Sequence, residues 1–209
     1  FSEDHYEREQ RQLSETLFAQ GNGYLGVRGG FEESEANAHD SGTYLNGVYT
    51  STPITYGEKA YGYASNNQSM VTVPNGKLIE LSIAGERFSL DEGELLKYER
   101  SLDFRNGVLS REVIWTSEAG KSLSISMKRL VSLVEKNLCV IEWSITPLNF
   151  SGRVEIISEL QVQLSGAGSE SDDPRAGSSV ARGDIELQQR QSHEEQLLLG
   201  QHIHSSGFS

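Results

Sequence analysis

The sequence predicts an all-β protein, an antiparallel β-sandwich that is preceded by a short N-terminal helix. After residue 20, apolar and polar residues alternate through most of the chain, which is the pattern of half-buried strands. Short turns separate these segments and no amphipathic helix intervenes, which favours antiparallel pairing. The 209 residues, 36% of them hydrophobic, can bury a sizeable core, and we expect one domain over 1–209.

The predicted elements follow in chain order. Residues 2–17 are charged and polar with a few apolar positions, which indicates one irregular helix. Residues 77–90 form two alternating runs that join near 84–86, and residues 107–130 form two more that turn at 118–120. In the last of these runs Leu123, Ile125 and Met127 share one face of the predicted strand. We therefore expect two hairpins in this part of the chain.

Four further strands are expected toward the C-terminus, in residues 136–148, 152–164, 184–190 and 196–207. The segment SGAGSESDDPRAGSS, residues 165–179, is rich in Gly, Ser, Asp and Pro and is predicted to be a long polar loop inside the domain. The chain ends soon after the segment QHIHSSGFS, residues 201–209, with no evident finishing cap, so we expect the sandwich to be incomplete at its C-terminal end.

Composition excludes several classes of function. The formal net charge is −12, from 18 basic and 30 acidic residues, which disfavours binding to nucleic acid or to an anionic membrane surface. No apolar run approaches the roughly 20 residues that span a bilayer. Cys139 is the only cysteine and lies in an apolar strand pattern, so we expect a buried structural thiol, no disulfide and a cytoplasmic location.

The segment GNGYLGVRGG, residues 21–30, contains the pattern G-x-G-x-x-G of dinucleotide-binding loops. That motif requires a preceding strand, a following helix and a surrounding βαβ unit. The following residues, VRGGFEESEANAHDSG, are poor material for a helix, and no βαβ periodicity is present. We therefore expect Gly21 and Gly23 to form a turn, and Gly26 to lie in a strand that another group approaches closely.

Several segments together carry a resemblance to a known family. They are TLFAQGNGYLGVRGGFEE (16–33), GTYLNGVY (42–49), VPNGKLIELSIAGERFSL (73–90), residues 98–133 and ITPLNFSGRVEIIS (145–158). In this order they resemble the N-terminal domain of glycoside hydrolase family 65, which contains maltose, trehalose and kojibiose phosphorylases. The resemblance implies a large, supersandwich-like β-sandwich that is truncated before the (α/α)₆ barrel of the family.

The resemblance also implies where the chemistry lies. The catalytic carboxylic acid of the family belongs to the barrel, so no catalytic residue, metal or cofactor is expected within this chain, and the isolated chain should be inactive. The full-length enzyme would cleave an α-glucosyl disaccharide, with inorganic phosphate as co-substrate and inversion at the anomeric carbon. The expected partner of the chain is its own C-terminal barrel, with a homodimer also expected. The alternatives are a free-standing carbohydrate-binding β-sandwich and a structural interaction module.

Four residues are candidates for a substrate entrance or an interdomain contact: Asn22, Tyr24, Arg28 and Tyr44. For Asn22 and Arg28 a structural role is favoured, because Asn beside Gly commonly caps its own turn and a guanidinium can pair with a buried carboxylate. Tyr24 and Tyr44 could stack on a sugar ring, although tyrosines in strand patterns more often belong to the core.

Other polar residues are predicted to be structural. Glu32 and Glu33 are adjacent in a polar segment and are expected to be solvated surface carboxylates, and Asp103 is expected to accept hydrogen bonds at a strand end. His202 and His204 share one face of a predicted strand, but a third ligand is lacking and no metal site is expected. The remaining notable side chains, Trp115 and Trp143, are expected in the core, which argues against an exposed tryptophan platform for carbohydrate.

Overall fold

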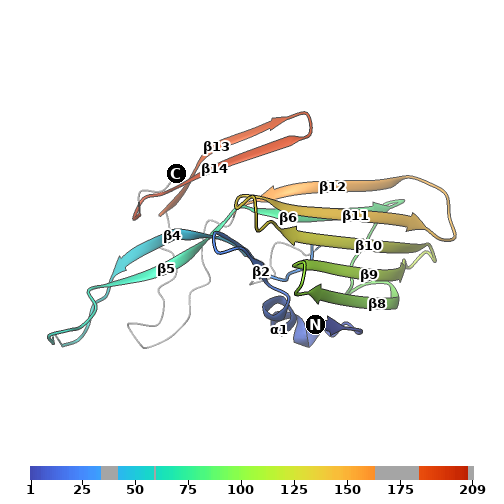
Figure 1. Ribbon diagram of the computed structural model, residues 1–209. Helices are drawn as coiled ribbons and strands as arrows, with labels where there is room; N and C mark the ends of the chain where they lie inside the picture. The colour runs from blue at the N-terminus through green and yellow to red at the C-terminus, as the bar shows by residue number, and fades with distance from the viewer. Residues whose placement is uncertain (34–41, 59, 163–183, 207–209) are drawn as a thin grey trace. The chain divides into compact units, whose positions relative to one another are not determined.

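The computed structural model describes residues 1–33, 42–58, 60–162 and 184–206, and it confirms the all-β, antiparallel prediction (Figure 1). The N-terminal helix is α1 (Arg11–Leu17), preceded by the 3-10 turn η1 (Arg8–Gln10). The chain forms two compact units, Phe1–Gly42 with Gly76–Glu159 and Thr43–Asn75 with Leu160–Ser209. The predicted polar loop 165–179 lies outside the described residues.

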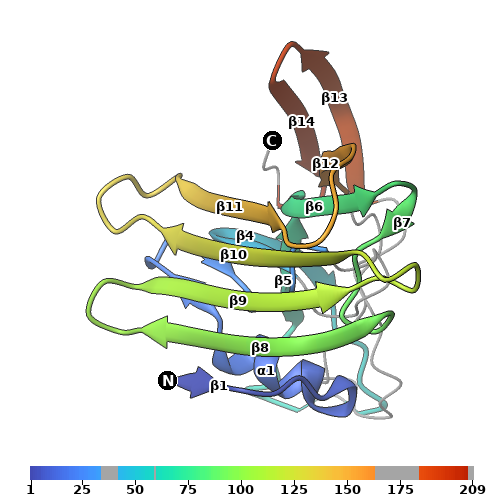
Figure 2. The same ribbon diagram turned by 90° about the vertical axis from the view of Figure 1, so that its right-hand side faces the viewer.

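The first unit is built on an antiparallel sheet in the order β1–β8–β9–β10–β11 (Figure 2). The bounds of these strands are β1 (Ser2–Glu3), β8 (Glu94–Asp103), β9 (Val108–Thr116), β10 (Ser122–Val131) and β11 (Cys139–Pro147). Leu123, Ile125 and Met127 of β10 are all buried, so the predicted alternation is confirmed. The predicted turn at 118–120 is confirmed as well, and Gly120 there has a φ of 78°.

A second sheet of this unit has the order β12–β6–β7, with β12 (Val154–Gln161), β6 (Asn75–Ile83) and β7 (Glu86–Arg87). The turn between β6 and β7 lies at the predicted place. Ala84 and Gly85 both have positive φ, 49° and 88°, which is the backbone that a two-residue hairpin turn requires.

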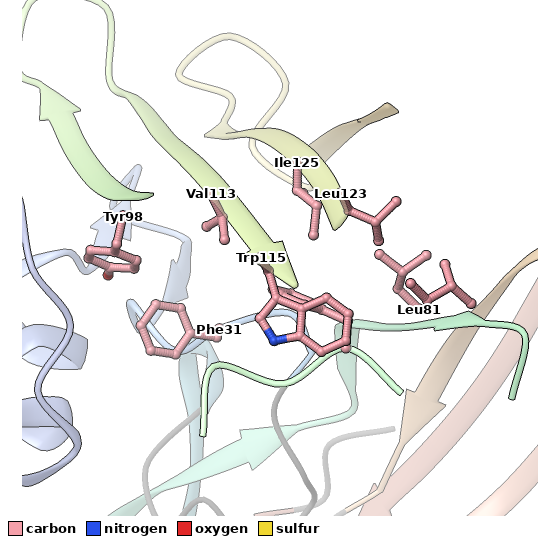
Figure 3. Packing of buried hydrophobic residues seen from close by; sticks show 9 residues of the cluster. Phe31, Leu81, Tyr98, Val113, Trp115, Leu123 and Ile125 are labelled. Atoms are coloured by element: carbon pink, nitrogen blue, oxygen red, sulfur yellow. The ribbon is translucent and has the colours of Figure 1, made fainter. Parts of the chain in front are cut away.

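The main core lies between these two sheets, because its buried side chains come from both of them (Figure 3). Trp115 is its largest member and is 2% exposed. Its indole meets the ring of Phe88 edge to face, with centroids 5.3 Å apart, and its Nε1–H donates to the carbonyl of Glu92 at 2.6 Å. A second cluster consists of Phe18, Leu102, Leu109 and Met127.

The edge position of β11 corrects two predictions. Cys139 and Trp143 are half-buried rather than buried, because no further strand of this sheet lies beyond β11 among the described residues. Burial nevertheless raises the pKa of the Cys139 thiol. Trp115, in contrast, confirms the prediction of a core tryptophan.

The second unit contains two antiparallel hairpins, β4 (Thr43–Pro53) with β5 (Asn66–Val73) and β13 (Ile185–His193) with β14 (Gln196–Ile203). The two C-terminal strands confirm the sequence prediction. The buried cluster of this unit is small, with Val71, Ile185 and Ile203 as its buried members and Val48 packed against them. Across the described ranges of the chain, no helix is long and apolar enough to cross a membrane.

The packing of Trp115 generates a prediction about stability. Trp115→Ala should lower the free energy of unfolding by about 3–5 kcal/mol, because it leaves a large cavity between the two sheets. Chemical denaturation measures the loss, and Leu133→Ala is the control because Leu133 is 78% exposed. Equal stabilities of the two variants would contradict the assignment of Trp115 to the core.

Candidate functional site: the glycine-rich segment and its buried anchor

The glycine-rich segment forms a small hairpin, β2 (Gln20–Gly21) with β3 (Leu25–Val27). Asn22 organises its turn, since its Oδ1 accepts hydrogen bonds from the backbone N–H groups of Tyr24 and Leu25, at 3.0 and 2.8 Å. Gly23 follows with a φ of 86°, a conformation that glycine adopts without strain. The predicted turn is therefore present, and it is capped by the asparagine.

The same asparagine also ties the hairpin to the main sheet. Its Nδ2 donates to the carbonyls of Ser132 and Lys136, at 2.6 and 3.0 Å, in the loop between β10 and β11. The Nζ of Lys136 lies 4.6 Å from the centroid of the half-buried Tyr24 ring. Asn22 and Tyr24 thus share one contact region with the β10–β11 loop.

Beyond the hairpin the chain passes very close to α1. The N–H of Gly29 donates to the carbonyl of Glu15 at 2.7 Å. A Cβ atom at position 29 would lie 2.7 Å from the Cβ of Phe18 and 2.9 Å from the carbonyl oxygen of Glu15. Position 29 therefore has room only for glycine, since any side chain would push this segment away from the helix.

The next two residues correct the sequence prediction. Glu32 and Glu33 are 1% and 7% exposed, whereas solvated surface carboxylates were expected. Both oxygens of Glu33 accept from the guanidinium of Arg111 at 2.5 Å, and Glu32 Oε1 accepts from Arg129 Nη1 at 2.7 Å. Bidentate pairing with arginine supplies the charge and hydrogen bonds that two buried carboxylates need.

The arginines also bind the backbone of the glycine-rich segment. Arg129 donates to the carbonyls of Arg28 and Gly30, at 3.3 and 3.2 Å, and through Nε to Gln20 Oε1 at 2.9 Å. Arg100 donates to the carbonyl of Gly29. Three consecutive carbonyls, those of residues 28–30, therefore accept hydrogen bonds from two buried guanidinium groups.

The strand register explains why the arginines gather here. Arg100 of β8 and Arg111 of β9 are direct cross-strand partners, and Arg129 of β10 lies opposite Leu109 of β9. Like charges placed opposite one another destabilise a sheet unless counter-charges lie between them. Arg100 finds further support in two aromatic rings, since its guanidinium lies 4.4 Å from the Phe18 centroid and 4.7 Å from that of Phe31.

The electrostatics follow from this arrangement. Burial, together with the neighbouring Arg111 and Arg129, lowers the pKa of Arg100 to about 10. Burial also opposes the charge of Arg111, but Glu33 and Glu32 outweigh it and raise the pKa of that guanidinium. Lys77 on β6 is 3% exposed, and burial and the charge of Arg129 lower its pKa to about 8.

Sequence reasoning missed these arginines, although a signal was present. Arg100, Arg111 and Arg129 occupy the inward positions of strands whose other inward residues are apolar, such as Val113 beside Arg111 and Met127 beside Arg129. A basic residue at a position where the strand alternation expects a buried apolar one is a candidate for a buried ion pair. Three such residues on adjacent strands predict a cluster of buried ion pairs.

Three of the four predicted site residues belong to the first unit, and the fourth belongs to the second. Arg28 lies directly after β3, and its Nη2 donates to Thr16 Oγ1 at 2.8 Å, so it joins Asn22 and Tyr24 in the first unit. Tyr44 lies on β4 of the second unit, opposite Thr72. The proposed role of these residues at an entrance or an interdomain contact stays a prediction.

Two further predictions concern polar side chains outside the cluster. Asp103 ends β8, and its Oδ1 accepts from the N–H of Arg105 at 2.9 Å, which confirms its role at a strand end. His202 and His204 lie with ring centroids 4.8 Å apart, and His204 Nε2 is 3.3 Å from Glu186 Oε2. Within the described ranges, no group of three His, Cys, Asp or Glu side chains could hold a metal ion.

Comparisons with known proteins agree with the resemblance seen in the sequence. A sequence profile described as "Glycosyl hydrolase family 65, N-terminal domain" matches residues 1–209. The chain is 40% identical to alpha,alpha-trehalose phosphorylase of Thermoanaerobacter brockii over 170 residues, which are 80% of this chain and 22% of that protein. It is 34% identical to kojibiose phosphorylase of Halothermothrix orenii over 154 residues, 74% of this chain and 18% of that protein. The chain thus spans about a fifth of the length of these relatives.

A solved structure supports the same fold. It comes from the human microbiome and is provisionally named a kojibiose phosphorylase. It superposes with a TM-score of 0.74 at 18% identity, over 97% of this chain and 25% of that one.

The buried cluster predicts a large effect of Arg111→Met. This change leaves the Glu33 carboxylate buried without its partner, so the free energy of unfolding should fall by about 3–5 kcal/mol. Urea denaturation measures the change. Lys128→Met is the matched control. Lys128 on β10 and Glu142 on β11 form a largely exposed ion pair with an N–O distance of 3.8 Å. Loss of this pair should lower the free energy of unfolding by less than about 1 kcal/mol. Equal losses in the two variants would refute the anchoring role of Arg111.

Lys77 predicts a pH dependence of stability. Its pKa is lowered from 10.5 to about 8 on folding, so between these pH values the unfolded chain binds the proton that the folded chain has released. Stability should therefore rise with pH in this window, by up to about 3 kcal/mol relative to a Lys77→Met variant. Denaturant titrations of both proteins from pH 7 to 10.5 measure the difference. Parallel pH profiles of the two proteins would show that Lys77 keeps its ordinary pKa.

Proposed function

Because the chain belongs to glycosyl hydrolase family 65, whose N-terminal domain it matches along its whole length, we propose that it is the non-catalytic N-terminal domain of a longer enzyme. That enzyme cleaves an α-linked glucosyl disaccharide by phosphorolysis. The observation that carries the proposal is the similarity to two relatives that are named as phosphorylases of trehalose and of kojibiose, at 40% and 34% identity.

The proposed reaction transfers a glucosyl group to inorganic phosphate. A general acid protonates the glycosidic oxygen while a phosphate oxygen attacks the anomeric carbon from the opposite face, which forms a C–O bond and breaks one. The products are glucose 1-phosphate, with inverted configuration, and the released sugar. Because phosphate is itself the nucleophile, the enzyme needs one carboxylic acid and a phosphate site rather than two catalytic carboxyl groups.

The geometry of the first unit supports a non-catalytic role. A general acid must reach the glycosidic oxygen of a bound substrate. Glu32 and Glu33 lie inside the fold, and their oxygens are engaged by Arg111 and Arg129. These carboxylates hold the glycine-rich segment in place and are not available to a substrate.

The apolar surface beside β11 supports a role in packing against the catalytic barrel. Ile141, Trp143 and Ile145 pack against the core clusters but are only half-buried. Exposed aliphatic side chains continue from the β10–β11 loop into β11, namely Leu133, Val134, Leu138 and Val140. Exposed apolar residues in such numbers near one loop and strand are typical of interaction surfaces. The proposed partner is the barrel of the same polypeptide, and the proposed location is the cytoplasm.

An activity assay tests the proposal. The isolated chain, incubated with trehalose, kojibiose or maltose and inorganic phosphate, should release no glucose 1-phosphate, because it lacks the acid and the phosphate site. A longer protein that contains this chain and the barrel should release it with one of these sugars. Glucose 1-phosphate from the isolated chain would refute the non-catalytic role. Release of free glucose alone by the longer protein would establish hydrolysis instead.

A further inference from the structure

The loop that joins β4 and β5 carries three tyrosines within eight positions, Tyr56, Tyr61 and Tyr63. Figure 1 shows this loop at the end of the β4–β5 hairpin. Tyr61 is fully exposed and Tyr63 is 56% exposed, and no other tyrosine among the residues that the structure describes is as exposed as these two. Exposed aromatic rings are the feature that a carbohydrate-binding surface requires and that the two tryptophans do not provide.

The loop presents these rings in a defined arrangement. Tyr56 and Tyr63 have ring centroids 4.8 Å apart and planes inclined by 47°, so the first ring supports the second. The N–H of Ile54 donates to the carbonyl of Ser65 at 2.9 Å, which closes the base of the loop, and the N–H of Tyr63 donates to that of Ala60 at 3.4 Å. Gly62, with a φ of 88°, makes the bend between the two exposed tyrosines.

The chemistry of the loop favours a neutral, hydroxyl-rich ligand over the core of a protein interface. Over the described positions of the loop, from 54 to 65, the exposed large hydrophobic side chains are the rings of Tyr61 and Tyr63, and the next exposed one along the chain is Met70 on β5. The amides of Asn66 and Gln68 are exposed at the start of β5 and can both donate and accept hydrogen bonds. Aromatic faces pack on the C–H face of a pyranose ring, while amide groups bind its hydroxyls.

We propose that Tyr61 and Tyr63, with Tyr56 behind them, form a stacking site for α-linked gluco-oligosaccharides. The site itself rests on the exposed rings, whereas the choice of α-linked glucose as the ligand rests on the proposed function. The site lies within the second unit and uses no residue of the buried cluster, so it adds a binding role to a domain that performs no chemistry.

Titration of the 209-residue chain with maltohexaose, followed by calorimetry and by NMR shifts, tests the site. The wild type should bind maltohexaose with a dissociation constant in the millimolar range or lower. The double variant Tyr61→Ala/Tyr63→Ala should weaken binding by at least about tenfold, because it removes both stacking faces. Tyr61→Phe/Tyr63→Phe keeps the rings and should bind within about threefold of the wild type. Phe104→Ala is the matched control, since it removes another ring that is 76% exposed, in the first unit, and should leave binding unchanged.

Three results would overturn the proposal: no binding of maltohexaose by the wild type, equal binding by the double alanine variant, or an equal loss in Phe104→Ala. Circular dichroism of each variant establishes that it is folded, which is expected because the substituted rings are exposed. Sedimentation of the wild type and the double alanine variant adds a fourth result. A self-association that disappears in the variant would assign the tyrosines to a contact between copies. Absence of glucose 1-phosphate release by the longer protein would refute phosphorolysis and leave the binding result standing.

Discussion

The ion pair between Glu33 and Arg111, with Glu32 and Arg129 beside it, is the interaction on which the first unit depends. The paired residues are separated by 78 and 97 positions in the chain, so the pairs join the N-terminal segment to the middle of the main sheet. Burial of either partner without the other would destabilise the folded state by several kcal/mol, because the charge would be unpaired in the interior. The segment before residue 34 and the β8–β9–β10 sheet are therefore expected to reach their folded positions together.

The same cluster explains the glycine-rich motif. In a dinucleotide-binding loop, glycines bring backbone N–H groups close to an anionic pyrophosphate. Here the polarity is reversed, since the carbonyls of Arg28, Gly29 and Gly30 face the buried cations Arg100 and Arg129. Gly29 additionally allows the chain to touch α1. The close backbone approach is thus made by residues 28–30, which follow the G-x-G-x-x-G pattern, and the groups they bind are guanidinium groups of the protein's own sheet. Within the pattern, a Cβ atom at Gly26 would meet no atom within 4 Å, so the close contact expected there is wrong.

The elements of this fold were largely predictable, because period-two alternation reports directly which strand face is buried. That signal located β9, β10, both turns of the first unit and the C-terminal hairpin. The burial of Glu32 and Glu33 was not predictable from their neighbours, since a polar segment gives no local sign of burial. Their burial depends on pairing with Arg111 and Arg129, which are far away in the sequence. The strand alternation did place these two arginines on the buried face. The exposure of Tyr61 and Tyr63 likewise depends on the length of the β4–β5 hairpin, which the sequence pattern did not define.

The interior also shows why its cations are mainly arginines. Four buried cations, Arg100, Arg111, Arg129 and Lys77, accompany the buried carboxylates of Glu15, Glu32 and Glu33 in the part of the chain that the structure describes. A guanidinium stays charged even when burial lowers its pKa to about 10, as for Arg100, and its planar fork binds a carboxylate or several carbonyls at once. The ammonium group of Lys77, with its pKa lowered to about 8, is the cation that can release its proton. Glu32 and Glu33 lie against Arg111 and Arg129, whereas Glu15 pairs with the partly exposed Arg11 at 3.5 Å. The arginines therefore hold the buried carboxylates at any ordinary pH, and Lys77 is the buried cation of the described residues whose charge depends on pH.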